Sequence, residues 1–215
     1  MSRIFLYADS ADREAVGTLL DDRLIHGVTT NPTILRRGGL SADAAADLYA
    51  EWTGRGAAEV FFQASGADVA AMEASGHRIA QLGSSAVVKV PATAIGFPVA
   101  ARLAAVDVPV LVTAVYSSAQ AVTAAAIGAR YIAPYLGRLD DSGVDGLALV
   151  REMVTLLSGT ETHPLVASVR SPERIVELVA SGVRHVTAAP AVLRAALLHD
   201  ASDAAAAVFE RDAAM

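Results

Sequence analysis

Apolar residues recur along the chain in short runs, and segments with helical spacing separate these runs. Residues 86–91 read AVVKVP, and a run so rich in β-branched residues is typical of a strand buried on both faces. Residues 12–23 instead place Val16, Leu19 and Leu20 on one face of a helix. Eight strands are predicted, at residues 3–9, 27–31, 59–64, 86–91, 109–115, 131–135, 165–169 and 185–188.

A helical segment follows each predicted strand. The expected helices cover residues 12–23, 41–52, 69–82, 97–106, 119–127, 144–157, 172–180 and 191–198, with one more at 203–211. Because the composition does not change along this alternation, we predict one α/β domain over residues 1–215. Its fold is a single (β/α)8 TIM barrel with an additional C-terminal helix. An open doubly wound sheet is the alternative, but no glycine-rich dinucleotide fingerprint follows the first strand.

Composition restricts the possible partners. The 215 residues carry a net charge of −6 and no cysteine, and the arginines are scattered, so no nucleic-acid-binding footprint is predicted. No run of about 18 apolar residues predicts a membrane span, and the first nine residues do not resemble a secretion signal. We therefore expect a cytoplasmic protein that binds small molecules, not nucleic acid or membranes. The five histidines lack the spacing of a metal site, so no metal is predicted.

Lys89 stands in the middle of an apolar strand and is the only lysine among 17 basic residues. Burial disfavours the charged ammonium and lowers the pKa of a lysine amine. A neutral amine attacks carbonyl carbons and forms a Schiff base, whereas arginine stays charged and cannot. The alternative is a lysine at a strand end that packs its stem and extends its amine into solvent.

Seven of the eight predicted strands carry a hydrogen-bonding side chain at or near their carboxyl end. In a (β/α)8 barrel these ends lie on one rim, where the active sites of this fold are built. Any one of these side chains alone would be assigned to packing or to a loop, but together they predict a polar pocket for a substrate with several hydroxyl groups. The residues are Asp9, Asn31, Gln63, Lys89, Thr113, Tyr135 and Ser168.

Five motifs give the chain a resemblance to a known family. They are VTTNP at residues 28–32, VVKVP at 87–91, TAVYS at 113–117, APYLGRLD at 133–140 and ASVRSP at 167–172. In this order and spacing they resemble the small transaldolase and fructose-6-phosphate aldolase family, over about residues 5–209. The resemblance implies a (β/α)8 barrel and metal-free Schiff-base chemistry without a cofactor. It also implies a homo-oligomer, a pentamer or a decamer.

The resemblance also implies roles for individual residues. Lys89 matches the lysine that forms the Schiff base in the family. Asp9 matches the carboxylate that contacts the substrate hydroxyls and assists bond cleavage. Thr29 and Asn31 match positions that hold the dihydroxyacetone portion of the substrate.

A second set of matched residues concerns the phosphate. Arg138 and Ser168 match the pair that receives the sugar phosphate in the family, and Arg170 is a secondary candidate. A guanidinium fork suits phosphate oxygens, and a hydroxyl adds one more donor. As an alternative, Arg138 could form a surface ion pair with Asp140 or Asp141.

Two positions separate the branches of the family. The aldolases carry Gln and Tyr where this chain has Gln63 and Tyr135, and the transaldolases carry Glu and Phe. In the aldolases these two side chains and a threonine, here Thr113, order a water that moves protons. The chain therefore resembles an enzyme that cleaves fructose 6-phosphate to dihydroxyacetone and glyceraldehyde 3-phosphate.

Two other functions remain open. A transaldolase would transfer the dihydroxyacetone unit between sugar phosphates such as sedoheptulose 7-phosphate and glyceraldehyde 3-phosphate. A non-catalytic sugar-phosphate-binding barrel is disfavoured, because a binding protein does not need a nucleophilic amine. Gly137 departs from the aldolase pattern, which has asparagine there, and SVRSP at residues 168–172 is closer to the transaldolases. These departures concern the specificity for the acceptor.

Overall fold

The strands form a closed barrel in which every strand is parallel to its neighbours. A computed structural model describes residues 3–215. Strand order follows the sequence, and the last strand pairs with the first, so the predicted (β/α)8 barrel is confirmed and the open sheet is wrong. The strands are β1 (Phe5–Asp9), β2 (Gly27–Thr29), β3 (Glu59–Gln63), β4 (Ala86–Pro91), β5 (Val110–Val115), β6 (Tyr131–Pro134), β7 (His163–Val169) and β8 (His185–Ala188).

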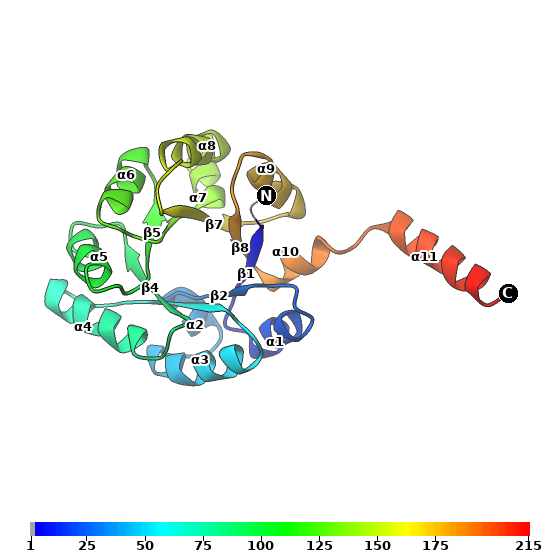
Figure 1. The fold of residues 1–215 in the computed structure, drawn as a ribbon, viewed down its shortest axis with the longest axis horizontal. Helices are drawn as coiled ribbons and strands as arrows, with labels where there is room; N and C mark the ends of the chain where they lie inside the picture. Colours follow the sequence, from blue (N-terminus) through cyan, green and yellow to red (C-terminus); the bar gives the residue numbers. More distant parts are fainter. Residues whose placement is uncertain (1–2) are drawn as a thin grey trace.

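Helices surround this barrel on the outside (Figure 1). All nine predicted helices are present, and α2, α7 and a single 3-10 turn, η1 (Ala42–Ala44), were not expected. The short helix α2 begins directly after β2, because Pro32 occupies its first turn and Asn31 caps it. The helices are α1 (Arg13–Asp21), α2 (Pro32–Arg37), α3 (Ala45–Gly54), α4 (Val69–Ala80), α5 (Gly96–Ala104), α6 (Ser118–Ala126), α7 (Leu136–Asp141), α8 (Gly146–Leu156), α9 (Pro172–Ala180), α10 (Pro190–Ala195) and α11 (Asp200–Ala213).

The core of the protein consists of two hydrophobic clusters. One lies between the strands and the surrounding helices and consists mainly of valine, leucine and alanine. The other fills the inside of the barrel and includes Tyr7, Phe61, Val87, Leu111 and Leu165. Because bulky side chains occupy the axis, the inside is a packed core, and chemistry is confined to its two mouths.

The amino-terminal mouth of the barrel contains a buried carboxylate. Glu59 accepts hydrogen bonds from the hydroxyls of Tyr7 at 2.8 Å and Tyr131 at 3.0 Å, and it pairs with Arg130 at 3.2 Å. The Tyr7 hydroxyl also lies 3.1 Å from Nδ1 of His185. We call these five residues the N-terminal mouth cluster. Such pairing is required, because a buried carboxylate without partners costs several kcal/mol or more.

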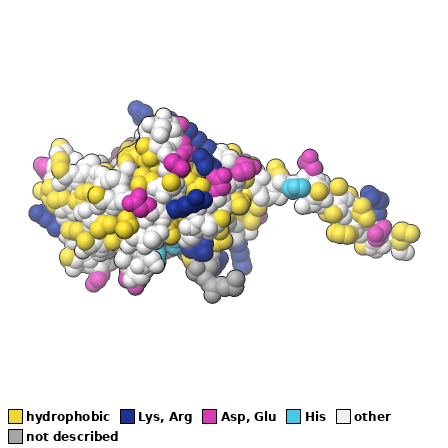
Figure 2. All heavy atoms as spheres, turned by 90° about the horizontal axis from the view of Figure 1, so that it is seen from above, with side chains coloured by type: hydrophobic (Ala, Val, Ile, Leu, Met, Phe, Trp, Pro, Cys, Tyr) yellow, Lys and Arg dark blue, Asp and Glu magenta, His cyan; other side chains and the backbone are white. Residues whose placement is uncertain are grey.

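Helix α11 projects from the barrel as an arm and exposes hydrophobic side chains (Figures 1 and 2). None of its 14 residues is buried, and Phe209 is 68% exposed. Leu198, in the segment between α10 and α11, is 73% exposed. Over residues 3–215, no helix is both long and apolar enough to cross a membrane.

Candidate active site

The carboxyl-terminal mouth brings the predicted residues together through strand register. Asp9 lies opposite Thr29 in the next strand, and Gln63 lies opposite Lys89. Thr113 is beside Pro91, which follows Lys89 by two residues. Side chains at i and i+2 of a strand share a face, so these ends form one continuous arc around the mouth.

Lys89 is buried, with 4% of its surface exposed, so the alternative of an amine extended into solvent is wrong. Its Nζ donates a hydrogen bond to the backbone carbonyl oxygen of Thr30 at 2.6 Å. Burial lowers the pKa of Lys89 below its usual value, and the negative charge of Asp9 opposes this only in part. The mouth therefore holds an amine that gives up its proton more easily than an exposed lysine does.

Asp9 is held by a hydroxyl from the neighbouring strand. The Thr29 hydroxyl donates to Oδ1 of Asp9 at 2.7 Å, and the same hydroxyl lies 2.6 Å from that of Thr187. Thr187, on β8, was not among the seven residues expected from the sequence. With it, all eight strands supply a polar side chain to this end of the barrel, where seven were expected.

Tyr135 and Thr113 form the opposite wall. Their hydroxyls lie 2.8 Å apart. Tyr135 follows β6 and is 8% exposed, and burial raises the pKa of its phenol, against a smaller opposing effect of the hydrogen bond with Thr113. At neutral pH the phenol is therefore a proton donor. Tyr116 packs edge-on against its ring, with centroids 6.1 Å apart.

Two strands are irregular where they reach this mouth. Ser168 in β7 has φ of 59° and Ala114 in β5 has φ of 58°, and both lie where the register with the next strand shifts. Positive φ is uncommon for residues other than glycine, and such bulges re-aim neighbouring side chains, often beside active sites. The bulge in β7 thus sets the direction of the Ser168 hydroxyl.

Arg138, in the first turn of α7, is exposed, and its guanidinium lies over the ring of Tyr135. Its guanidinium carbon lies 4.6 Å from the centre of the Tyr135 ring. Between residues 3 and 215, Arg138 forms no ion pair, so the alternative of a pair with Asp140 or Asp141 is wrong. Those carboxylates instead bind Arg174 and Arg170, which follow the neighbouring strand β7.

Arg170 is an exposed residue and is engaged by two hydrogen bonds. Its Nη1 and Nη2 donate to the carboxylate of Asp141 at 2.7 and 2.5 Å. A Cβ at Gly137 would lie only 2.7 Å from Nε of Arg170 and from the backbone oxygen of Ser168. The glycine thus lets the start of α7 approach the end of β7 closely, and a side chain there would displace Arg170.

Asn31 and Gln63 complete the arc. The side-chain oxygen of Asn31 accepts the amide proton of Ile34 at 3.0 Å, which caps α2 and leaves the NH2 group available. Gln63 is partly buried at the end of β3, beside Lys89. Among the residues from 3 to 215, no three His, Cys, Asp or Glu side chains are grouped so that they could hold a metal ion. The arrangement offers a nucleophilic amine, a carboxylate base and a phenol, the groups needed to form an imine and move protons.

Sequence comparison relates the chain to proteins of known class. The model of the family described as Transaldolase/Fructose-6-phosphate aldolase matches residues 6–215. A probable transaldolase from Caulobacter vibrioides is 36% identical over 210 residues, which covers 96% of this chain and 95% of the relative. A probable transaldolase from Nitrosopumilus maritimus is 35% identical over 198 residues, or 90% of this chain and 87% of the relative.

Structural comparison concerns the fold alone. The thiamine phosphate pyrophosphorylase from Pyrococcus furiosus superposes with a TM-score of 0.63 at 17% identity, covering 88% of this chain and 87% of that protein. A mandelate oxidase superposes with a TM-score of 0.62 at 19% identity, covering 90% of this chain and 66% of the oxidase. At such identities the likeness supports the barrel and carries nothing about chemistry.

Proposed function

Because the chain belongs to the transaldolase/fructose-6-phosphate aldolase family, we propose that it is a Schiff-base aldolase that cleaves fructose 6-phosphate. The products are dihydroxyacetone and glyceraldehyde 3-phosphate. The observation that carries the proposal is the amine of Lys89, which is buried at the barrel mouth and has a lowered pKa. A structural lysine would not need to be desolvated in this way.

The reaction begins with an imine. The neutral Nζ of Lys89 attacks C2 of the open-chain ketose, and the resulting carbinolamine loses water to give an iminium ion. The hydrogen bond from Nζ to the Thr30 carbonyl oxygen fixes the position of the amine before attack. The iminium carries a positive charge next to C3, which makes it an acceptor for electrons.

Carbon–carbon cleavage follows. Asp9 takes the proton of the C4 hydroxyl, the C3–C4 bond breaks, and its electron pair moves into the iminium to form an enamine. C4 leaves as the aldehyde carbon of glyceraldehyde 3-phosphate. Oδ1 of Asp9 is already occupied by the Thr29 hydroxyl at 2.7 Å, so Oδ2 is the oxygen left to act as the base.

Protonation and hydrolysis complete the cycle. A water held by Gln63, Thr113 and Tyr135 protonates C3 of the enamine, and a second water adds to the iminium and releases dihydroxyacetone. The phenol of Tyr135 suits this task because its pKa is raised by burial and its hydroxyl is aligned by Thr113. Asn31 and Thr29 hold the hydroxyls of the dihydroxyacetone unit.

Arg138 and Ser168 receive the phosphate. The surroundings of Arg138 support this role. Its guanidinium lies over the ring of Tyr135 and is not paired with a carboxylate within residues 3–215. Arg170 shares its charge with Asp141 through two hydrogen bonds. Its charge can contribute to the electrostatic potential at the phosphate. A direct contact with the phosphate requires that Arg170 first breaks its hydrogen bonds with Asp141.

Transaldolase activity is the second candidate, and the printed names of the curated relatives favour it. In a transaldolase the enamine attacks an acceptor aldehyde instead of taking a proton. Gln63 and Tyr135 favour the aldolase, since a water held there protonates the enamine before an acceptor binds.

Borohydride trapping tests the proposal. With dihydroxyacetone, we expect reduction to attach a three-carbon unit to Lys89, and with fructose 6-phosphate a three-carbon or six-carbon unit. Peptide mass spectrometry locates the attachment. Dihydroxyacetone should then accumulate from fructose 6-phosphate without an acceptor. Formation of sedoheptulose 7-phosphate and glyceraldehyde 3-phosphate only with erythrose 4-phosphate, without free dihydroxyacetone, would identify a transaldolase. Binding without an adduct would identify a sugar-phosphate-binding protein.

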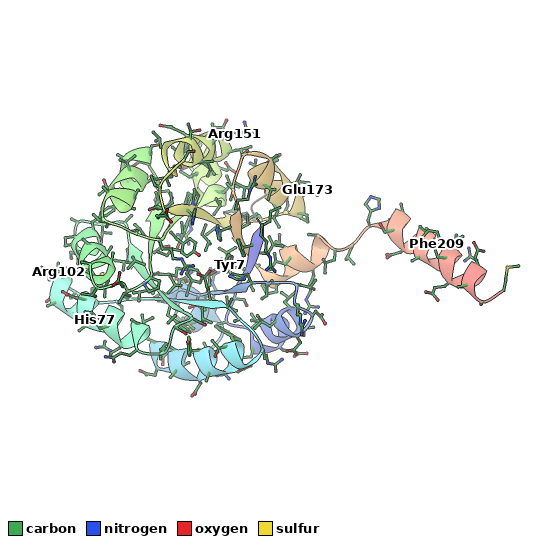
Figure 3. All side chains as sticks on the ribbon, viewed as in Figure 1. Tyr7, His77, Arg102, Arg151, Glu173 and Phe209 are labelled. Atoms are coloured by element: carbon green, nitrogen blue, oxygen red, sulfur yellow. The ribbon has the colours of Figure 1, made fainter. Side chains whose placement is uncertain are left out.

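We further propose that the protein is a homo-oligomer in which α11 packs on another copy. A helix of 14 residues is only marginally stable alone in water, and α11 has no buried residue to stabilise it. Its exposed Phe209 lies on the projecting arm, apart from the barrel (Figure 3). A neighbouring subunit is the partner that the family resemblance implies, as a pentamer or decamer.

Replacing Phe209 and Leu198 with aspartate should shift the assembly toward monomers, because both side chains would lose an apolar contact and gain a charge. Multi-angle light scattering measures the mass directly. As a control, Val176→Asp changes an exposed valine on α9 and should leave the assembly intact. An unchanged oligomer in the double variant would show that the arm is not an interface.

A further inference from the structure

The eighth strand contributes one hydroxyl to the catalytic mouth, that of Thr187. This residue is 2% exposed and lies opposite Tyr7 in β1. Its Oγ1 is 2.6 Å from Oγ1 of Thr29 and 3.3 Å from the backbone oxygen of Tyr7. Thr29 in turn contacts Oδ1 of Asp9 at 2.7 Å. Thr187, Thr29 and Asp9 therefore form one chain of hydrogen bonds across strands β8, β2 and β1.

Counting protons fixes the direction of this chain. An ionised carboxylate only accepts hydrogen bonds, so the single hydroxyl proton of Thr29 points to Asp9. The 2.6 Å contact then requires a proton from the other partner, so Thr187 donates to Thr29. The Thr187 hydroxyl could also donate this proton to the backbone oxygen of Tyr7, but at 3.3 Å that hydrogen bond is longer and weaker.

We propose that Thr187 is a positioning residue that holds Asp9 through Thr29. The donation from Thr187 prevents the Thr29 hydroxyl from rotating, and the fixed hydroxyl holds Oδ1 of Asp9. Oδ2 then keeps one direction toward the mouth, where it takes the substrate proton. This inference rests on the proposed function for the role of Asp9, but the hydrogen-bond chain itself does not.

A packing role is the competing explanation for Thr187. Threonine is common in strands, and a β-branched side chain at this position fills the seam between β1, β2 and β8. Valine has the same shape and lacks only the hydroxyl. The substitution Thr187→Val therefore keeps the packing and removes the donor, while Thr187→Ser keeps the donor and removes a methyl group.

The expected result is a loss of rate without a loss of imine formation. Removing one hydrogen bond in a chain that ends on a charged group should lower kcat for fructose 6-phosphate cleavage about tenfold. KM should stay within about twofold, and borohydride should trap dihydroxyacetone on Lys89 as efficiently as in the wild type. Thr187→Ser should recover most of the rate. A packing role predicts the reverse order, with serine the more damaging change.

A double-mutant cycle tests the path through Thr29. Thr29→Val breaks the chain at its centre, so adding Thr187→Val should cause almost no further loss of kcat. Independent, additive losses would overturn the proposal, and so would a full rate in Thr187→Val.

Crystal structures separate this proposal from the enzymatic one. In Thr187→Val we expect the Thr29 hydroxyl and the Asp9 carboxylate to occupy more than one orientation, compared with a single orientation in the wild type. This readout needs no turnover. Unchanged, single orientations of both side chains would overturn the inference even if the aldolase reaction were established. If borohydride attached no sugar carbon to Lys89 in the wild type, the proposed function would be rejected. The orientations of Thr29 and Asp9 in Thr187→Val would still decide whether Thr187 holds Asp9.

Discussion

Lys89→Met is expected to abolish turnover, lowering kcat at least about 10⁴-fold, because no other group at the mouth can form an imine. Methionine has nearly the shape of lysine and suits a site that is 4% exposed. The barrel should therefore fold as before. Steady-state cleavage of fructose 6-phosphate and transfer to erythrose 4-phosphate measure the loss, and borohydride should attach no sugar carbon to the protein.

Lys89→Arg is the matched charged control. It should be equally inactive, since a guanidinium stays protonated and is no nucleophile, and it should be less stable because its charge must be buried. If either variant retained more than about a hundredth of the wild-type kcat, catalysis through an imine on Lys89 would be excluded.

The methionine variant should also gain stability at neutral pH. Burial lowers the pKa of Lys89 in the folded protein, whereas the unfolded chain titrates near 10.5. Below that pH the unfolded state binds the proton more readily, so the buried amine reduces the free energy of unfolding. Removing the amine removes this cost. The advantage of Lys89→Met over the wild type should be present at pH 7 and shrink as the pH approaches 10.5, as measured by urea denaturation.

The strands of the barrel were predictable because parallel strands covered by helices read as apolar runs. Residues 86–91 were delimited correctly, and Lys89 was recognised because a cation interrupts such a run. Helix α7 was missed, because it is only six residues long and directly follows the strand residues Tyr131–Pro134. A helix of that length has too few turns to show an amphipathic pattern.

Side-chain partners across the barrel were not predictable. Thr187 reads as an ordinary strand residue, and only closure of the barrel between β1 and β8 brings it to Thr29. The acidic residues near Arg138 in sequence suggested a local ion pair. They bind Arg170 and Arg174 instead, which the segment after β7 brings beside α7. Arg138 and Asp140 are only two positions apart on α7, and side chains at that spacing do not face each other on a helix.

The partners within the N-terminal mouth cluster were also not predictable from the sequence. Its residues are spread from Tyr7 to His185 and meet only because the strands close. Tyr7 lies inside the barrel (Figure 3) and gives its single proton to Glu59, so Nδ1 of His185 must donate to the Tyr7 oxygen. The lowered pKa of His185 keeps the ring neutral at pH 7 in the folded protein, so an additional proton has to enter at its other nitrogen.

Buried His185 should lower the free energy of unfolding at acidic pH. Burial lowers the pKa of His185 from 6.5 to about 3, and the nearby His163, His26 and Arg130 add to this effect. Between these two values the unfolded chain binds a proton that the folded protein does not, so the free energy of unfolding falls as the pH drops. The loss from this group between pH 7 and pH 4 amounts to about 3 kcal/mol. Access for solvent exists, since a cavity of about 760 Å³ lined by His185 opens at this mouth.

His185→Phe should remove this sensitivity. Phenylalanine keeps the stacking on Phe5, where the ring centroids are 4.8 Å apart, but it loses the hydrogen bond to Tyr7. At pH 7 the variant should therefore be less stable than the wild type by about 1 kcal/mol. At pH 4 the order should reverse, because only the wild type must exclude a proton from a buried ring. Urea denaturation at both pH values measures whether the order of the two stabilities reverses. His77→Gln alters an exposed histidine on α4 and should follow the wild type. If the curves of His185→Phe and the wild type stayed parallel, acid lability would arise from the carboxylates and not from the neutral imidazole at the base of the barrel.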